Sequence, residues 1–210
     1  MAFAVADQAL PQEQDRLVVE FVYALGLTIL LPILTLVMAS AVFGDLVSDE
    51  TLVYLWLRPV RRITLTIGAW AAALVVVYPI TVPPLVAAAW IGSEGNVDIV
   101  KGTAAAASLN VVVYSAMFTL LGLLLKRALL FGLMYIFIWE LFVASVGDGA
   151  ATLSIGTYPA VVLSRMTGEM PFEIESLEER SMTVAVIVPI VVAAGSLLLT
   201  NWRLAKTRVA

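Results

Sequence analysis

The chain has 210 residues, of which 61% are hydrophobic, and a mean hydropathy of +1.00. A soluble domain of this size cannot bury so much apolar surface, so the composition predicts an all-α, polytopic membrane protein. The lack of Cys and His excludes disulfides, thiol catalysis, His-ligated metals and Ser-His chemistry. The formal net charge of −4 is less informative than the placement of the charges along the chain.

Five long apolar segments predict five membrane-spanning helices, since each is near or above the ~20 residues that a bilayer core needs. Residues 1–16, before the first of them, are polar and acidic and lack the basic region and apolar run of a secretory signal. Pro32 lies in the middle of the first segment, and Pro79, Pro83 and Pro84 should kink the second or break it in two. The segments cover residues 17–43, 63–91, 101–125, 128–146 and 181–202.

Residues 44–62, with the sequence GDLVSDETLVYLWLRPVRR, differ from the apolar helices on either side. Acids stand near the start and bases near the end, which suits the dipole of a helix. Ser48 is the expected N-cap and Pro59 marks the end. The stretch therefore predicts a short helix at the membrane surface. Its charged residues are Asp45, Asp49, Glu50, Arg58, Arg61 and Arg62.

The charges also predict the orientation in the membrane. The side that carries residues 44–62, the turn at Lys126 and Arg127, and the C-terminus has eight bases and three acids, whereas the opposite side has four bases and twelve acids. The positive-inside rule then places the C-terminus in the cytoplasm and the N-terminus outside. We expect a multi-pass protein of the cell membrane, with residues 147–180 forming an external loop.

Two polar residues inside the predicted spans are candidates for the substrate pathway. Glu140 lies in the fourth, where a carboxylate is costly and should face a partner or water. It is a candidate substrate-pathway residue, as a contact for cargo or a proton, and the alternatives are a structural partner or a side chain that snorkels to the outer interface. Asn110 in the third span is a weaker candidate, because interhelical hydrogen bonds explain most such residues.

The stretch at residues 44–62 resembles the signature that follows the second transmembrane helix of type 2 ABC exporter permeases. The likeness is carried by Asp45 and Asp49, by Thr51-Leu52, by Tyr54-Leu55-Trp56, and by Arg58-Pro59-Val60-Arg61-Arg62. Two positions depart from the family pattern, because a Glu is usual where Leu46 stands and a Gly is common where Glu50 stands.

The resemblance implies that this stretch is a coupling helix, docked on a separate ATPase subunit. Short re-entrant or interfacial helices before the last span are also implied, and residues 158–166 would supply one; a plain external loop is the alternative. The family has six spans, so the first is absent from the visible pattern: either the sequence starts after it or the chain is a shortened form. The coupling contacts would come from Asp45, Asp49, Glu50, Thr51, Tyr54, Arg58 and Arg61, and an ordinary interfacial helix is the alternative.

The expected function is thus the transmembrane subunit of an ATP-driven exporter, which forms the substrate pathway with a second permease subunit, as a homodimer or heterodimer. The chain has no GxxxxGK[ST] motif, so ATP and Mg would be bound by the partner ATPase, and we expect neither enzymatic activity nor a cofactor in this chain. Membrane lipid is an expected partner and nucleic acid is not. A non-transporting scaffold or assembly protein is the alternative. An intramembrane aspartyl enzyme is disfavoured, because Glu140 has no second carboxylate beside it.

Overall fold

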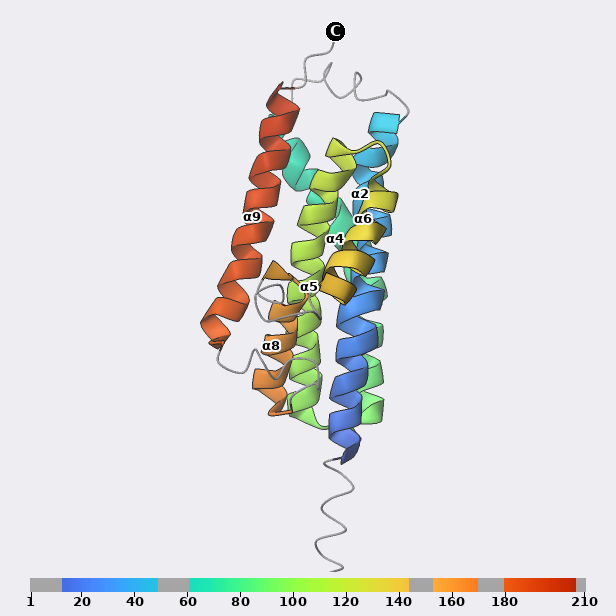
Figure 1. Ribbon diagram of the computed structural model, residues 1–210, viewed down its shortest axis with the longest axis vertical. Helices are drawn as coiled ribbons and strands as arrows, with labels where there is room; N and C mark the ends of the chain where they lie inside the picture. The colour runs from blue at the N-terminus through green and yellow to red at the C-terminus, as the bar shows by residue number, and fades with distance from the viewer. Residues whose placement is uncertain (1–12, 49–60, 144–152, 170–179, 207–210) are drawn as a thin grey trace, which may run out of the picture.

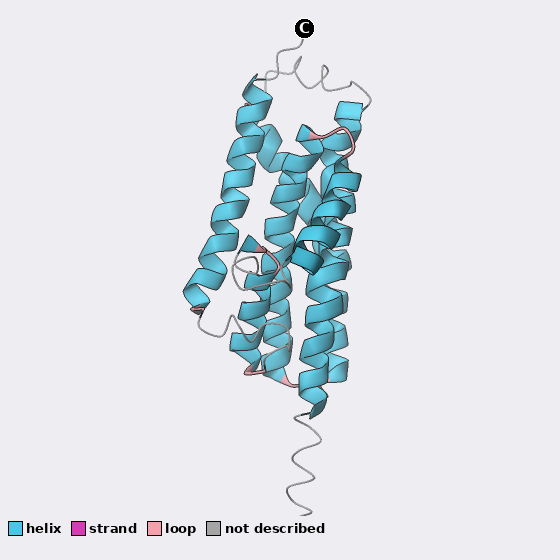
Figure 2. Cartoon of the chain, in the orientation of Figure 1, coloured by secondary structure: helices cyan, strands magenta, loops and turns pink. Residues whose placement is uncertain are grey.

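The computed structural model describes residues 13–48, 61–143, 153–169 and 180–206. Every regular element in these ranges is a helix (Figure 2). This confirms the prediction of an all-α protein with a bundle of apolar helices. Four helices are long and apolar enough to cross a membrane, namely Glu13–Gly44, Arg62–Gly92, Val97–Leu124 and Met182–Lys206.

The first long helix contains a change of hydrogen-bond register. An α-helical segment over residues 13–21 leads into the π-helix η1 (Val22–Leu30), and α2 (Leu31–Ser48) follows without a break. At the end of η1 the Leu31 N–H donates to the carbonyl of Gly26, five residues back, and not to Leu27. Pro32, the next residue, has no N–H to donate. The helix therefore passes Pro32 intact, but the Leu27 carbonyl loses its usual helical donors.

The second and third long helices form an antiparallel pair. The prediction that its prolines break the second span in two is wrong, because α4 (Arg62–Gly92) is one continuous helix that contains Pro79, Pro83 and Pro84. A tight turn follows, and α5 (Val97–Leu124) begins after Asn96, whose side chain accepts a 3.1 Å hydrogen bond from the Asp98 N–H. This is the usual work of an N-cap residue.

Helix α5 is the centre of the bundle. It packs against α2, α4, α8 and α9, and in Figure 1 it runs through the middle of the molecule. At Gly122 a Cβ atom would lie 2.3 Å from the Ser40 carbonyl oxygen, so α5 and α2 touch backbone to backbone there. By contrast, α4 and α9 (Met182–Lys206) keep large apolar side chains on their outer faces, with Val75 74% and Leu198 64% exposed. Such faces suit contact with lipid.

The fourth predicted span differs from the expectation. In place of one long helix over residues 128–146, the described part is α6 (Ala128–Met134) followed by the π-helix η2 (Tyr135–Val143), a shorter apolar helix than the other four. The predicted loop at 147–180 contains a further helix, α8 (Thr157–Thr167). Most of α8 is buried, and it packs on α5 and α9. Five full-length spans are therefore not confirmed.

Two ends of the bundle can be named by their turns. At the Lys126 end, α5 turns into α6; at the Asn96 end, α4 turns into α5. Helix α8 lies beside the half of α5 nearer the Asn96 end, because Gly102 of α5 faces Leu163 and Thr167. Helices α6 and η2 descend along the other half from the Lys126 end (Figure 1).

Most of the stretch at 44–62 lies outside the described residues, including Asp49, Glu50, Thr51, Tyr54 and Arg58. Its ends are described. Helix α2 runs on to Ser48, beyond the end predicted near residue 43, so Asp45 and Ser48 both belong to α2. The helix that Ser48 was expected to cap lies outside the described residues. Arg61 is the N-cap of α4, and its carbonyl accepts from the N–H of Thr64 at 2.9 Å.

Candidate functional site at Glu140

Glu140, the candidate acid of the fourth predicted span, is buried in the bundle. The Glu140 side chain, near the end of the described part of η2, is 8% exposed. Its carboxylate reaches the residues directly before α8, 14 to 16 positions further along the chain. The prediction of a snorkelling side chain is therefore wrong, because the carboxylate is held inside the bundle.

Within the described ranges, each carboxylate oxygen accepts from a hydroxyl and from a backbone N–H, and the Tyr114 hydroxyl also lies against the carboxylate. Oε1 accepts from the Tyr135 hydroxyl at 2.5 Å and from the Ile155 N–H at 3.1 Å. Oε2 accepts from the Ser154 hydroxyl and from the Gly156 N–H, the latter at 3.1 Å. Hydrogen bonds to a charged acceptor are roughly twice as strong as neutral ones. The four donors thus offset the cost of removing the carboxylate from water.

The π-helical register of η2 accounts for one of these donors. Bonds in a π-helix join residues five apart, so side chains five apart come to lie one above the other. Tyr135 and Glu140 have this separation, and their side chains meet. In an ordinary α-helix the matching separation is three or four residues.

The start of α8 accounts for the backbone donors. Gly156 is its N-cap and Ile155 precedes that residue, so both N–H groups lie at the end of the helix where the dipole favours negative charge. Two bonds close the turn before the helix: Thr157 Oγ1 donates to the Ser154 carbonyl at 2.8 Å, and the Tyr158 N–H donates to the Ile155 carbonyl at 3.3 Å. The Glu140 carboxylate acts as a cap for α8 from another helix.

The junction has no spare volume beside Gly156. A Cβ atom there would lie 2.9 Å from Glu140 Oε2 and 3.3 Å from the Tyr114 hydroxyl oxygen. Tyr114 is 1% exposed and stacks on Phe118 with ring centroids 5.4 Å apart, so α5 forms a firm wall behind the carboxylate. This arrangement favours the structural-partner interpretation of Glu140 over a contact with cargo.

Asn110, the second predicted pathway residue, serves the first helix. It is fully buried, and its Nδ2 donates to the Leu27 carbonyl at 3.0 Å. That carbonyl is the one left without a helical donor by the register change before Pro32. The amide therefore completes η1 across the helix interface, which is the interhelical role expected for such a residue. Asn110 Oδ1 accepts no hydrogen bond within the described part of the chain.

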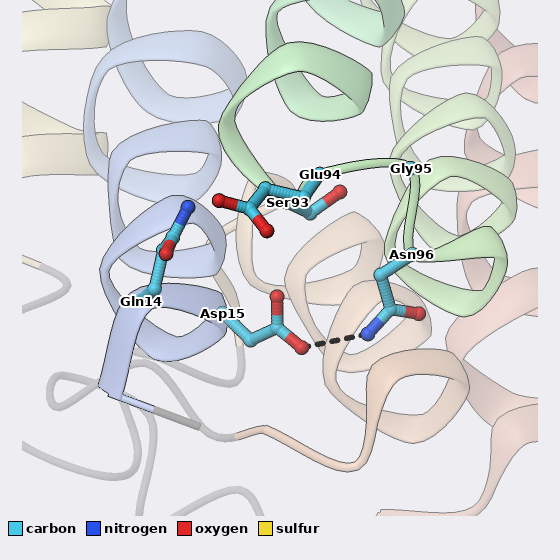
Figure 3. Close-up of a pocket in the computed structure, with 6 residues that line it drawn as sticks. All are labelled: Gln14, Asp15, Ser93, Glu94, Gly95 and Asn96. Carbon is cyan, nitrogen blue, oxygen red and sulfur yellow. Dashed lines mark hydrogen bonds between the residues drawn. The ribbon is translucent and has the colours of Figure 1, made fainter. Parts of the chain in front are cut away.

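A polar pocket of about 270 Å³ opens at the Asn96 end. Figure 3 shows the Asp15 carboxylate facing the Asn96 amide, to which it is joined by a 2.7 Å hydrogen bond. Gln14 Nε2 donates to the Gly92 carbonyl at 2.8 Å, so the pocket's polar groups fasten the first helix to the turn between α4 and α5. Its lining residues are Gln14, Asp15, Ser93, Glu94, Gly95 and Asn96. Among the described residues no group of acids is arranged to hold a metal ion.

The sequence pointed to Glu140 and Asn110 but missed the groups that bind them. Tyr114, Tyr135 and Ser154 look like ordinary helix or loop residues in the sequence. One signal was available for Tyr135, its separation of five residues from Glu140, but this is informative only once a π-helix is known. Two of the predicted coupling residues, Asp45 and Arg61, have a described backbone. They lie at the Lys126 end of the bundle, whereas Glu140 lies at its middle.

Comparisons with protein-family models, with curated proteins and with solved structures found no match to this chain. The function must therefore be argued from its own residues.

Proposed function

We propose that this chain is the transmembrane subunit of an ATP-driven exporter of the type 2 ABC class, energised by a separate ATPase subunit. The observation that carries the proposal is the stretch at 44–62, which resembles the docking segment of that family. Its Thr51-Leu52 step, its Tyr54-Leu55-Trp56 block and its ending from Arg58 to Arg62 are the most specific parts.

The position of this stretch supports the proposal. It joins the ends of α2 and α4 at the Lys126 end, where described bases gather. An excess of Lys and Arg marks the cytoplasmic side of a membrane protein, which is where an ATPase would be met. The bases with described positions at this end are Arg61, Arg62, Lys126, Arg127, Arg203 and Lys206.

Residues 44–62 are connected to the bundle by the chain that leads into α4 and also by a hydrogen bond to α9. Arg62 Nη1 donates to the Ala205 carbonyl at 3.1 Å, which ties the start of α4 to the end of α9. A displacement of the docked stretch would move α4 through the chain and α9 through this bond. Two helices that both pack on α5 would thus respond to one contact.

Co-purification tests the proposal. The full chain carries a tag, is expressed in its native host and is purified in a mild detergent. We expect an ATPase with a GxxxxGK[ST] motif to co-purify, and we expect the double reversal Asp49→Lys/Glu50→Lys to remove it without changing the elution volume of the chain.

The matched control is Glu94→Lys/Asp98→Lys, which reverses two acids at the opposite end and should retain the ATPase. If the reversal at 49 and 50 retains an active ATPase, the stretch is not the coupling element and the proposal fails. If wild-type chain brings down no ATPase, the non-transporting scaffold is the better interpretation.

A further inference from the structure

Helices η2 and α8 meet end to end at mid-depth of the bundle. Helix α8 begins beside Tyr114, in the middle of α5, and ends beside Gly102, near the Asn96 end. The α6–η2 segment starts at the Lys126 end and reaches the same level at Glu140. Neither α6–η2 as described nor the 11 residues of α8 amounts to the ~20 residues of a full crossing. Together they run from the Lys126 end to the Asn96 end of the bundle.

Three hydrogen bonds between the two halves converge on one side chain. Helix α8 packs its apolar residues on α5 and α9, and η2 lies close to η1 and α6. At the start of α8, the Ser154 hydroxyl and the N–H groups of Ile155 and Gly156 all donate to the Glu140 carboxylate of η2. Because these bonds are buried, they are strong while intact, and an unpaired donor left behind would be costly.

We propose that Glu140 is the joint of one interrupted membrane crossing: its carboxylate fixes where α8 begins, and loss of that carboxylate releases α8 from the bundle as a unit. We expect the remaining long helices to stay packed, since α2, α4, α5 and α9 share an apolar cluster that contains no residue of α8 itself and only Ile155 from the turn before it. This inference concerns the fold and does not depend on the proposed transport function.

Cysteine labelling can test the joint, because the chain has no cysteine of its own. Ala160→Cys places a reporter in α8, and Ala39→Cys places a matched one in α2; both alanines are fully buried. In otherwise wild-type protein, N-ethylmaleimide should label neither reporter while the protein stays folded in detergent. With Glu140→Gln, we expect at least tenfold faster labelling in α8 and an unchanged rate in α2.

Glu140→Gln is an informative variant because Gln has nearly the same size as Glu but carries an NH2 donor in place of one acceptor oxygen. Its Nε2 would face either the Tyr135 hydroxyl and the Ile155 N–H or the Ser154 hydroxyl and the Gly156 N–H, so one backbone donor loses its acceptor. If labelling becomes equally faster at both reporters, Glu140 supports the whole bundle. If labelling becomes faster at neither reporter, α8 is held in the bundle without Glu140. Either result overturns the proposal.

A milder variant keeps the test decisive if Glu140→Gln fails to fold. Tyr135→Phe with Ser154→Ala removes two hydroxyl donors and keeps the carboxylate bound to the Ile155 and Gly156 N–H groups, with the Tyr114 hydroxyl beside it. We expect labelling in α8 to quicken severalfold and labelling in α2 to stay constant. Constant labelling at both reporters would contradict the proposal here as well.

Discussion

A carboxylate is tolerated inside this apolar bundle because two hydroxyls and two backbone N–H groups surround it. The same arrangement leaves no space for a methyl group at Gly156, which faces both Glu140 and Tyr114. At the scale of single residues, the structure therefore makes a prediction about a glycine whose importance is invisible in the sequence.

Gly156→Ala should destabilise the protein by about 1–3 kcal/mol, because the new Cβ pushes on Glu140 Oε2 and a buried donor loses its partner. The matched control is Gly195→Ala, since a Cβ there meets nothing within 4 Å. It should be neutral or slightly stabilising, as Ala favours a helix over Gly by roughly 1 kcal/mol. Thermal unfolding of the two variants in one detergent measures both effects, and equal melting temperatures would contradict the crowding at Gly156.

At the scale of the helix, η1 and α5 are coupled through one amide. The register change before Pro32 leaves the Leu27 carbonyl without a helical donor, and Asn110 supplies one. The effects of Pro32 and Asn110 on stability should therefore depend on each other, although the two residues lie on different helices. Replacing either residue should change how much the other contributes to the stability of the protein.

A double-mutant cycle tests this coupling. Asn110→Leu alone should cost about 1–3 kcal/mol, since it leaves a buried carbonyl without a donor. Pro32→Ala supplies a new N–H at the position that Leu27 faces in the π register, so the cost of Asn110→Leu should shrink by at least half in that background. Thermal or denaturant unfolding of the four proteins gives the coupling energy. If the two changes in the free energy of unfolding simply add, Pro32 is not the reason that the Leu27 carbonyl needs the Asn110 amide as its donor.

The helices themselves were predictable because hydropathy and length depend on sequence alone. The predicted spans at 17–43, 63–91, 101–125 and 181–202 each correspond to a long helix. The end of α2 was predicted five residues short at 43, because nothing in the sequence from Gly44 to Ser48 stops a helix. The three prolines predicted a kink or a break in α4, and the continuous helix excludes the break, since a proline removes a bond but fits the helical φ angle.

The junction at Glu140 could be predicted only in part. The rule that an intramembrane acid needs a partner was sound, and it identified the right residue. The partner lies 14 to 16 residues away, directly before α8. The resemblance implied a short helix at residues 158–166, but no pattern in the sequence linked its start to Glu140. Sequence periodicity also assumes an α-helix, so the π register that aligns Tyr135 with Glu140 gives no signal.

At the scale of the whole molecule, the turns fix which charges share an end. Arg62, Lys126 and Arg203 lie toward one end of the bundle, and Asp15, Glu94 and Asp98 toward the other. The positive-inside rule then predicts the orientation of the complete chain.

Reporter fusions check this orientation. A reporter after Ala210 or in the turn at Lys126 should read cytoplasmic, and one inserted after Gly168, at the C-cap of α8, should read external. Alkaline phosphatase and a fluorescent protein provide complementary signals for the two sides. The reverse pattern would refute the orientation and, with it, the cytoplasmic placement of residues 44–62.

The bond from Asn110 to Leu27 also has a consequence for the time course of synthesis, because it joins residues 83 positions apart. At about 5–20 residues per second, a ribosome needs roughly 4 to 17 s to add the asparagine after the leucine. Throughout that interval the Leu27 carbonyl of the first helix has no hydrogen-bond donor. We therefore expect stable insertion of the first helix to be delayed until α5 has been synthesised. A nascent chain stopped before Asn110 should accordingly be extracted from membranes by alkaline carbonate more readily than one stopped after Leu124, and Pro32→Ala should narrow that difference.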